Sequence, residues 1–172
     1  MRIVLLATVP LLIASGAAAQ NAATKGIQGV YNIAKNYVLR SAEQVPEDKY
    51  SYKPVATVRS FGQIVAHLAD SNFAFCATAG GKPTAEGSSV EQTATKRADI
   101  IAKLKESYAA CDAVYNATTD AGLTKTYPMF GNQMSVSGIL TLNAAHNYEH
   151  YGNLVTYMRS LGMVPPSSQG GN

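Results

Sequence analysis

Residues 135–161 read SVSGILTLNAAHNYEHYGNLVTYMRSL, and this stretch decides the fold class. Its apolar side chains recur three and four residues apart, which is the period of one face of an α-helix. Gly162 and Pro165-Pro166 follow, and these residue types favour the end of a helix. We therefore predict a long amphipathic helix from about Ser135 to Leu161. Its inward stripe is expected to contain Ile139, Leu142, His146, His150, Tyr157 and Leu161.

Three more segments upstream have helical periodicity, at about 22–42, 60–79 and 90–116. The second begins with Ser60-Phe61-Gly62-Gln63, a capping-box pattern in which the serine and glutamine side chains bind the first free amides. A long connection, Val45 to Arg59, precedes it and is expected to form one wall of a cleft. Residues 127–132 predict a turn or short hairpin before the last helix. We expect an all-α fold, a four-helix bundle with long connections between helices one and two and between helices three and four.

The first nineteen residues have the pattern of a cleaved export signal. Arg2 supplies the positive charge, an apolar stretch follows from Ile3 to Ala14, and Ala17-Ala18-Ala19 are small residues that a signal peptidase accepts. The apolar stretch is too short to span a membrane. We expect a signal peptide at 1–19, the bundle at 20–166 and a disordered tail at 167–172. The expected location is the periplasm or the outside of the cell, without stable membrane insertion.

Charge and cysteine content narrow the function classes. The net charge of +3 is small and its basic residues are scattered, which argues against a nucleic-acid partner. The two cysteines, Cys76 and Cys111, form no CxxC motif, so a redox motif or haem attachment site is not indicated. The two cysteines lie at the same height along the bundle only if helices two and three run parallel. In that case an oxidising compartment permits a disulfide. The sequence leaves this open.

All three histidines of the chain fall at core-type positions of the predicted helices. His146 and His150 are four residues apart, so their side chains leave the same helix face one turn apart. His67 lies three residues after Ile64, on or beside the buried face of helix two. Buried imidazoles need partners for their nitrogens, and one shared metal ion would provide them. The predicted ligands of one divalent transition metal are therefore His67, His146 and His150. Imidazole ligands suit zinc, nickel, copper or iron, and the sequence does not choose among these metals; zinc or nickel is the expected ion.

The same histidines are open to other interpretations. In one, the bundle holds no metal and its histidines hydrogen-bond to tyrosines such as Tyr37 or Tyr108. Residues 146–150 also match HxxEH, the inverted zinc-protease motif, but no acidic residue follows His150 to complete such a site. A di-iron site of the ferritin type needs Glu-x-x-His motifs, and the chain has none. Glu149 remains a candidate for proton transfer beside the metal, or for a partner of a ligand histidine.

The chain resembles the DinB-like (DinB/YfiT) superfamily in three stretches. They are Tyr52-Lys53-Pro54 with SFGQIVAHLAD at 60–70, HNYEHYGNL at 146–154 and YMRSLGMVPPS at 157–167. The resemblance implies a four-helix bundle with a divalent metal held by three histidines, at His67, His146 and His150 here. It also implies thiol-dependent transferase or isomerase chemistry in some members, with bacillithiol, mycothiol or glutathione as cofactor. These thiols are mainly cytoplasmic, so the export signal argues against that chemistry in this chain.

The leading hypothesis is an exported metal-dependent hydrolase or transferase that acts on a small-molecule substrate. The alternative is a non-catalytic module that binds a metal or a small ligand. Both need the same ligands, so the sequence does not separate them. A homodimer is the expected assembly, because dimers are the commonest oligomers.

Overall fold

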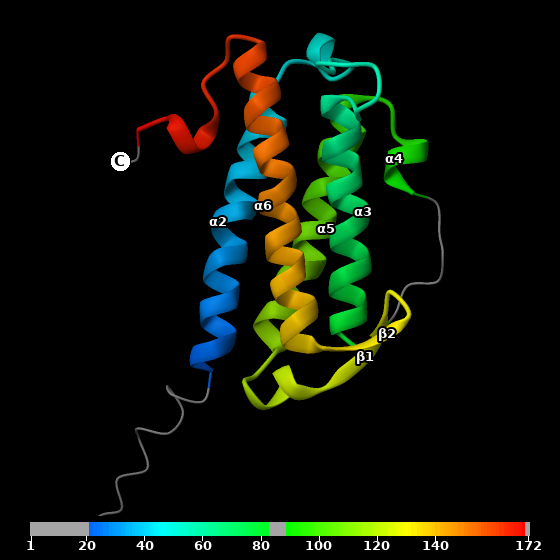
Figure 1. Cartoon of the computed structure of the whole chain (residues 1–172), viewed down its shortest axis with the longest axis vertical. Helices are drawn as coiled ribbons and strands as arrows, with labels where there is room; N and C mark the ends of the chain where they lie inside the picture. The colour runs from blue at the N-terminus through cyan, green and yellow to red at the C-terminus, as the bar shows by residue number, and fades with distance from the viewer. Residues whose placement is uncertain (1–20, 83–88, 171–172) are drawn as a thin grey trace, which may run out of the picture.

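The four long helices lie close to the predicted segments, except at the start of the third, in the computed structural model, which describes residues 21–82 and 89–170 (Figure 1). They are α2 (Ala22–Gln44), α3 (Phe61–Ala79), α5 (Arg97–Ala117) and α6 (Val136–Ser160). The predicted all-α four-helix bundle is confirmed. None of the helices in these two ranges combines the length and apolar character needed to cross a bilayer. The predicted export signal, residues 1–19, lies outside the described residues.

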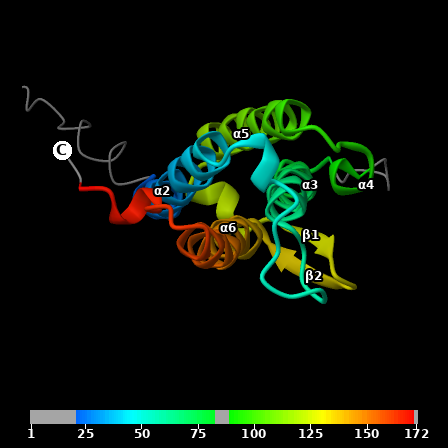
Figure 2. The same cartoon turned by 90° about the horizontal axis from the view of Figure 1, so that it is seen from above.

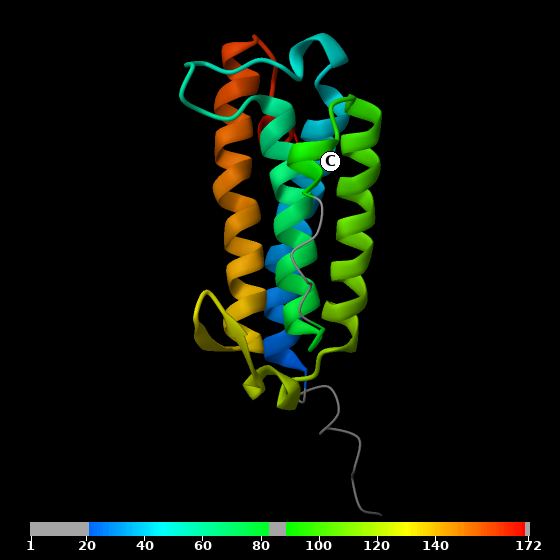
Figure 3. The ribbon, with the colours of Figure 1, turned by 90° about the vertical axis from the view of Figure 1, so that its right-hand side faces the viewer.

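The four helices do not simply alternate in direction. α2 and α6 run one way, and α3 and α5 run the other way (Figures 1 and 3). Seen from above, α2 and α3 stand at opposite corners of the bundle, and α5 and α6 occupy the other two (Figure 2). Because α3 and α5 are neighbours and parallel, the chain between them has to return along the length of the bundle.

This return connection contains a short helix, α4 (Val90–Thr93), and it corrects the predicted start of helix three. The prediction began that helix at Val90, whereas the chain leaves the helical conformation at Ala94 and α5 begins at Arg97. α4 is a separate short helix whose start is held by α3: the Asp70 carboxylate accepts hydrogen bonds from the Val90 and Glu91 amides and from the Ser89 hydroxyl. Asp70 thus ties α4 to α3. No glycine or proline marks the break in the sequence.

The connection between α2 and α3 packs on the first turn of α3. The predicted capping box is present: the Ser60 hydroxyl accepts from the Gln63 amide, and the Gln63 side chain accepts from the Ser60 amide. Tyr50 of this connection, which follows the 3-10 turn η1 (Glu47–Lys49), is buried against Gly62. A Cβ atom at Gly62 would lie 2.9 Å from the Tyr50 ring, so only glycine permits this approach.

A β-hairpin connects α5 to α6, after the 3-10 turn η2 (Ala121–Thr124), and confirms the predicted turn or short hairpin. Its strands are β1 (Thr126–Met129) and β2 (Asn132–Ser135), and Met129 pairs with Asn132. Phe130 and Gly131 therefore form the two-residue loop, with φ angles of 51° and 75°. Hairpin loops with two positive φ angles favour asparagine, aspartate or glycine. A phenylalanine in the left-handed region costs roughly 1–2 kcal/mol.

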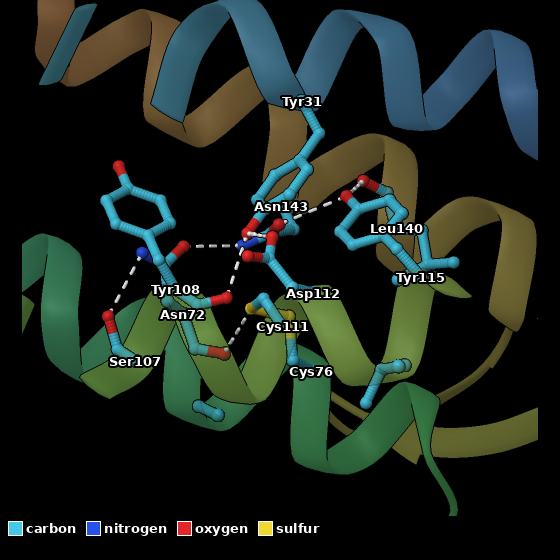
Figure 4. The surroundings of a disulfide bond; sticks show 12 residues. Tyr31, Asn72, Cys76, Ser107, Tyr108, Cys111, Asp112, Tyr115, Leu140 and Asn143 are labelled. Carbon is cyan, nitrogen blue, oxygen red and sulfur yellow. Dashed lines mark hydrogen bonds between the residues drawn. A yellow bond between two sulfur atoms is a disulfide. The ribbon is translucent and has the colours of Figure 1, made fainter. Parts of the chain in front are cut away.

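The centre of the bundle contains hydrogen-bonded polar side chains (Figure 4). The side-chain oxygen of Asn72 on α3 accepts hydrogen bonds from the amides of Asn143 and Asn147 on α6, at 2.8 and 2.9 Å. The Tyr108 hydroxyl of α5 donates to the Asn147 oxygen at 2.6 Å, and the Tyr115 hydroxyl donates to the Asn143 oxygen at 3.1 Å. Burial raises the pKa of Tyr108, which keeps its hydroxyl protonated as a donor. These five side chains, each at most 1% exposed, join three helices.

Cys76 of α3 and Cys111 of α5 form a disulfide, with their Cα atoms 5.1 Å apart (Figure 4). The parallel course of the two helices brings the cysteines level, which is the condition that the sequence left open. Both side chains are buried directly beside Asn72.

The end of the chain is ordered further than predicted. After α6, residues Pro166–Ser168 form a 3-10 turn, η3. The Ser167 amide donates to the Tyr151 hydroxyl at 2.8 Å, and the Gln169 side chain donates to Gln44 of α2 at 2.9 Å. The predicted disorder from Ser167 therefore differs from the structure up to Gln169, because these distant partners leave no local signal in the sequence. Residues 171–172 lie outside the described residues.

Replacing both cysteines by alanine should lower the free energy of unfolding by about 3–4 kcal/mol. The disulfide closes a loop between residues 35 apart, and chain entropy in the unfolded state accounts for a loss of this size. Urea denaturation of the oxidised wild type and of the double variant measures the difference. Equal midpoints and slopes for the two proteins would contradict this assignment of the bond's effect.

Candidate metal centre

Three histidines meet in the groove between the antiparallel helices α3 and α6. His67 comes from α3, while His146 and His150 come from successive turns of α6. One ring nitrogen from each histidine lies within 4.8 Å of those of the other two. The Nε2 atoms of His67 and His146 are 3.2 Å apart, and the three ring centres are 4.4–5.2 Å apart. The structure therefore brings together the three residues that the sequence predicted.

These histidines lie at the edge of the core and not at its centre, which corrects the predicted inward stripe of α6. His150 is 8% exposed, whereas His67 and His146 are only half-buried. The innermost positions of this part of α6 belong to Asn143 and Asn147, both fully buried. The spacing of apolar residues gave a wrong inward face for this part of α6, because two polar residues occupy core positions and find their hydrogen-bond partners there.

The Nδ1 atom of each histidine has its own polar neighbour. Glu91 lies 3.5 Å from Nδ1 of His67, and Glu149 lies 3.4 Å from Nδ1 of His146. The Asn153 side-chain amide lies 3.2 Å from Nδ1 of His150. In metal sites the nitrogen of a ligand histidine that does not bind the ion usually has such a partner, which fixes the ring orientation. Each Nε2 atom is thereby left to face the space between the three rings, which we call the common centre.

Glu149 is near the site, but on its outer side. Its side chain is 68% exposed and contacts His146 at the ring nitrogen remote from the common centre. This position fits the expectation of a histidine partner better than the expectation of a proton-transfer group.

Glu91, Asn153 and Ser71 are site residues that the sequence analysis missed. Glu91 reaches His67 only because Asp70 fastens α4 to α3, and Arg59 also holds it, with Nε donating to Oε1 at 2.8 Å. The Ser71 hydroxyl lies 3.2 Å from Nε2 of His146 and 3.5 Å from Nε2 of His67. Ser71 lies one turn after His67 on α3, a spacing that could have identified it.

His150 provides the test of whether a metal fits. Its Nε2 is buried and, within the described residues, has no hydrogen-bond partner. A buried polar atom without a partner is costly, and such exceptions call for an explanation. A half-turn of the Asn153 amide would present its oxygen to Nδ1–H and leave a lone pair on Nε2. A metal ion bound by this lone pair would remove the cost.

Burial, with nearby charges and rings, disfavours the charged form of two of the three histidines, His67 and His150. Burial, then His146 and His67, lower the pKa of His150 to about 4. Burial, then the Arg59 charge and His146, lower the pKa of His67. Neutral imidazoles are the form that binds metals.

The interpretation in which the histidines pair with tyrosines is wrong for the two tyrosines it named. The Tyr108 hydroxyl donates to Asn147, and the Tyr37 ring stacks on Tyr151 with ring centres 5.0 Å apart. Neither tyrosine hydrogen-bonds to a histidine of the described chain.

A cleft of about 670 Å³ opens beside His150. The connection between α2 and α3 contributes Lys53, Thr57, Val58 and Arg59 to its wall, which is the role expected from the length of this connection. Asn153 and Tyr157 of α6 line it as well. A small molecule in this cleft would reach the histidines from the His150 side.

The sequence model described as the DinB superfamily matches residues 32–154. The chain belongs to the DinB superfamily. The match spans α3 and the two histidines of α6, so all three histidines lie inside it. The predicted membership is confirmed.

Individual DinB-like proteins resemble the chain over most of its length. An uncharacterized protein of Bacillus subtilis, YjoA, is 28% identical over 132 residues, which cover 74% of this chain and 84% of that protein. The crystal structure of YjoA superposes with a TM-score of 0.66 at 24% identity, over 84% of this chain and 98% of that one. A DinB-like protein from Bacillus cereus superposes with a TM-score of 0.70 at 17% identity, over 83% and 95% of the two chains.

An enzyme shares the fold at lower identity. The mycothiol-dependent maleylpyruvate isomerase superposes with a TM-score of 0.58 and 14% identity, over 76% of this chain and 60% of the isomerase chain. At this identity the likeness concerns the fold alone.

The metal-free protein should lose stability as the pH falls from about 6.5 to about 4. The pKa of His150 is 6.5 in the unfolded chain and about 4 in the folded chain, so in this window the unfolded state binds more protons. The loss attributable to His150 is at most about 3 kcal/mol, and above pH 6.5 the contribution is constant. Urea unfolding in chelator across this range measures it. The same slope in His150→Leu would contradict the assignment to His150.

Proposed function

We propose that this DinB-superfamily protein is a metal-dependent enzyme in which His67, His146 and His150 hold one divalent transition metal. The observation that carries the proposal is the buried Nε2 of His150, which lacks a hydrogen-bond partner in the described chain and belongs to the group of three converging histidines. Neutral imidazoles suit zinc and nickel, so these two metals are the first candidates. Three protein ligands are typical of a catalytic site, which keeps a position open for substrate.

The residues around the histidines have supporting roles in this proposal. When bound, a divalent metal would polarise a substrate or activate water or a thiol. Glu91 and Glu149 hold the rings of His67 and His146 through Nδ1 and increase the basicity of Nε2. After the half-turn of its amide, the Asn153 oxygen would accept from Nδ1–H of His150 and act in the same way. The cleft beside His150 admits a small molecule, and Lys53 and Asn153 offer it hydrogen-bond donors.

Hydrolysis is the reaction class that we favour over thiol transfer. The disulfide between Cys76 and Cys111 supports an oxidising compartment, in agreement with the export signal expected at residues 1–19. The proposed location is therefore periplasmic or secreted. The mycothiol-dependent neighbour keeps transfer to a thiol as the second reaction to assay.

A non-catalytic metal-binding module is the second candidate. Glu149, the acidic residue next to His150, contacts the outer edge of His146, so it does not face the common centre. Addition of azide to the cobalt-loaded protein separates the two candidates. A change in the visible spectrum indicates an exchangeable position and favours the enzyme, whereas an unchanged spectrum favours the binding module.

The mature protein, purified without chelator or histidine tag, should contain about one equivalent of a transition metal. His146→Ala should lose the metal while keeping its far-ultraviolet circular dichroism, because His146 is half-buried at the edge of the core. Tyr148→Ala, at an exposed position on the same helix turn, is the matched control and should keep the metal. Elemental analysis measures the content. Unchanged metal in His146→Ala, or no uptake by the wild type on titration, would refute the site.

Glu91→Gln and Glu149→Gln should both weaken metal binding, within the ~10–100-fold range found for partners of ligand histidines. Glu91→Gln should have the larger effect, because the Glu91 side chain is 21% exposed and that of Glu149 is 68% exposed. Competition with a chromophoric chelator gives both affinities. Glu106→Gln, which removes an exposed partner of Lys103, is the control. Wild-type affinity in both variants would show that these carboxylates do not act on the imidazoles.

A further inference from the structure

Phe130 is an exposed aromatic residue at a backbone position that disfavours it. It forms the loop of the β1–β2 hairpin with Gly131, at a φ of 51°, and its side chain is 69% exposed. Asparagine or glycine would fit this loop without strain, and a large apolar side chain gains nothing from water. Outliers of this kind cluster at functional sites.

The hairpin brings Phe130 to the histidine site. The Phe130 ring centre lies 6.1 Å from that of Phe75, and the Phe75 ring centre lies 5.6 Å from that of His146. Both pairs have nearly perpendicular rings, the geometry of favourable edge-to-face contacts. Phe75 is 6% exposed, so it acts as a buried support, whereas Phe130 presents its ring to the surroundings.

The two sides of the site thus differ in chemistry. Beyond His150 lies the cleft, whose polar lining includes Lys53, Arg59 and Asn153. Beyond His146 lie the rings of Phe75 and Phe130. The hairpin and the connection between α2 and α3 both project on the α3–α6 side of the bundle, the hairpin near the end where α6 begins and the connection near the end where α3 begins (Figures 2 and 3). A molecule bound between them meets donors on one side and an aromatic surface on the other.

We propose that Phe130 contacts the substrate and receives its apolar part, with Phe75 as the positioning residue that supports the ring. The substrate class is a small molecule with a polar, metal-binding group joined to a hydrophobic arm, and an aromatic arm suits the exposed ring best. This inference rests on the proposed function, because the polar group is held at the three histidines.

The test compares two metal-binding probes that differ in their hydrophobic arm, acetohydroxamate and benzohydroxamate. Calorimetric titration of the zinc-loaded protein gives both dissociation constants, and elemental analysis confirms the zinc content of each sample. The ratio of the two constants isolates the contribution of the phenyl group. In Phe130→Asn the preference for benzohydroxamate should fall by about three- to tenfold relative to the wild type, the size of one aromatic contact. The acetohydroxamate constant should stay within about twofold.

Two further variants control the test. Asparagine suits the left-handed position of residue 130, so Phe130→Asn is expected to fold, and circular dichroism verifies this. Val164→Asn replaces another exposed apolar side chain, in the segment after α6, and should keep the wild-type preference. Phe130→Leu keeps an apolar surface and should retain part of the preference.

The outcomes separate this inference from the proposed function. A wild-type chain that takes up no zinc, or holds zinc but binds neither hydroxamate, overturns the proposed function and this inference with it. If zinc and both probes bind and Phe130→Asn keeps the full phenyl preference, the inference alone is overturned. A loss of the preference in Phe130→Asn, but not in Val164→Asn, supports it.

Discussion

The two hydrogen bonds that the Asn72 side-chain oxygen accepts from Asn143 and Asn147 set the alignment of α3 against α6. A buried amide oxygen has two lone pairs, and both are used here. Sliding α6 by one turn would break both bonds in the interior, where unsatisfied polar groups are costly. Ser71 and His146 are the immediate sequence neighbours of Asn72 and Asn147. The alignment that satisfies the asparagines therefore also brings the histidines of the two helices face to face.

A second set of contacts fixes the orientation of the rings within that alignment. Asp70 attaches α4 to α3, α4 carries Glu91, and Glu91 meets Nδ1 of His67. On α6, Glu149 and Asn153 occupy the equivalent positions beside His146 and His150, each three residues along the helix. The Nδ1 atoms of the histidines are thus contacted by side chains from two elements, α4 and α6. Such support reduces the freedom of each ring and prepares the three Nε2 atoms for a common ligand.

The sequence predicts helices and histidines well because both follow local spacing. The three- and four-residue periods gave the four helices, Ser60 and Gln63 marked the start of α3, and HxxxH paired His146 with His150. The parallel course of α3 and α5 is not predictable in this way, because no residue type between 80 and 96 indicates whether the two helices run parallel or antiparallel. That direction brings Cys76 and Cys111 to the same level and so permits the disulfide. Likewise, Asn143 and Asn147 look like surface residues until their partners are known, and Glu91 belongs to the site only through Asp70.

The bond between Cys76 and Cys111 has a consequence for the integrity of the chain. It closes a covalent ring that contains the end of α3, the whole of α4 and most of α5. A protease that cuts once inside this ring would leave both pieces joined through sulfur. The cut protein would migrate as one species without a reducing agent and as two with it. Glu91 lies inside the ring and the three histidines lie outside it, so the bond also keeps Glu91 tethered to the polypeptide that carries its histidine.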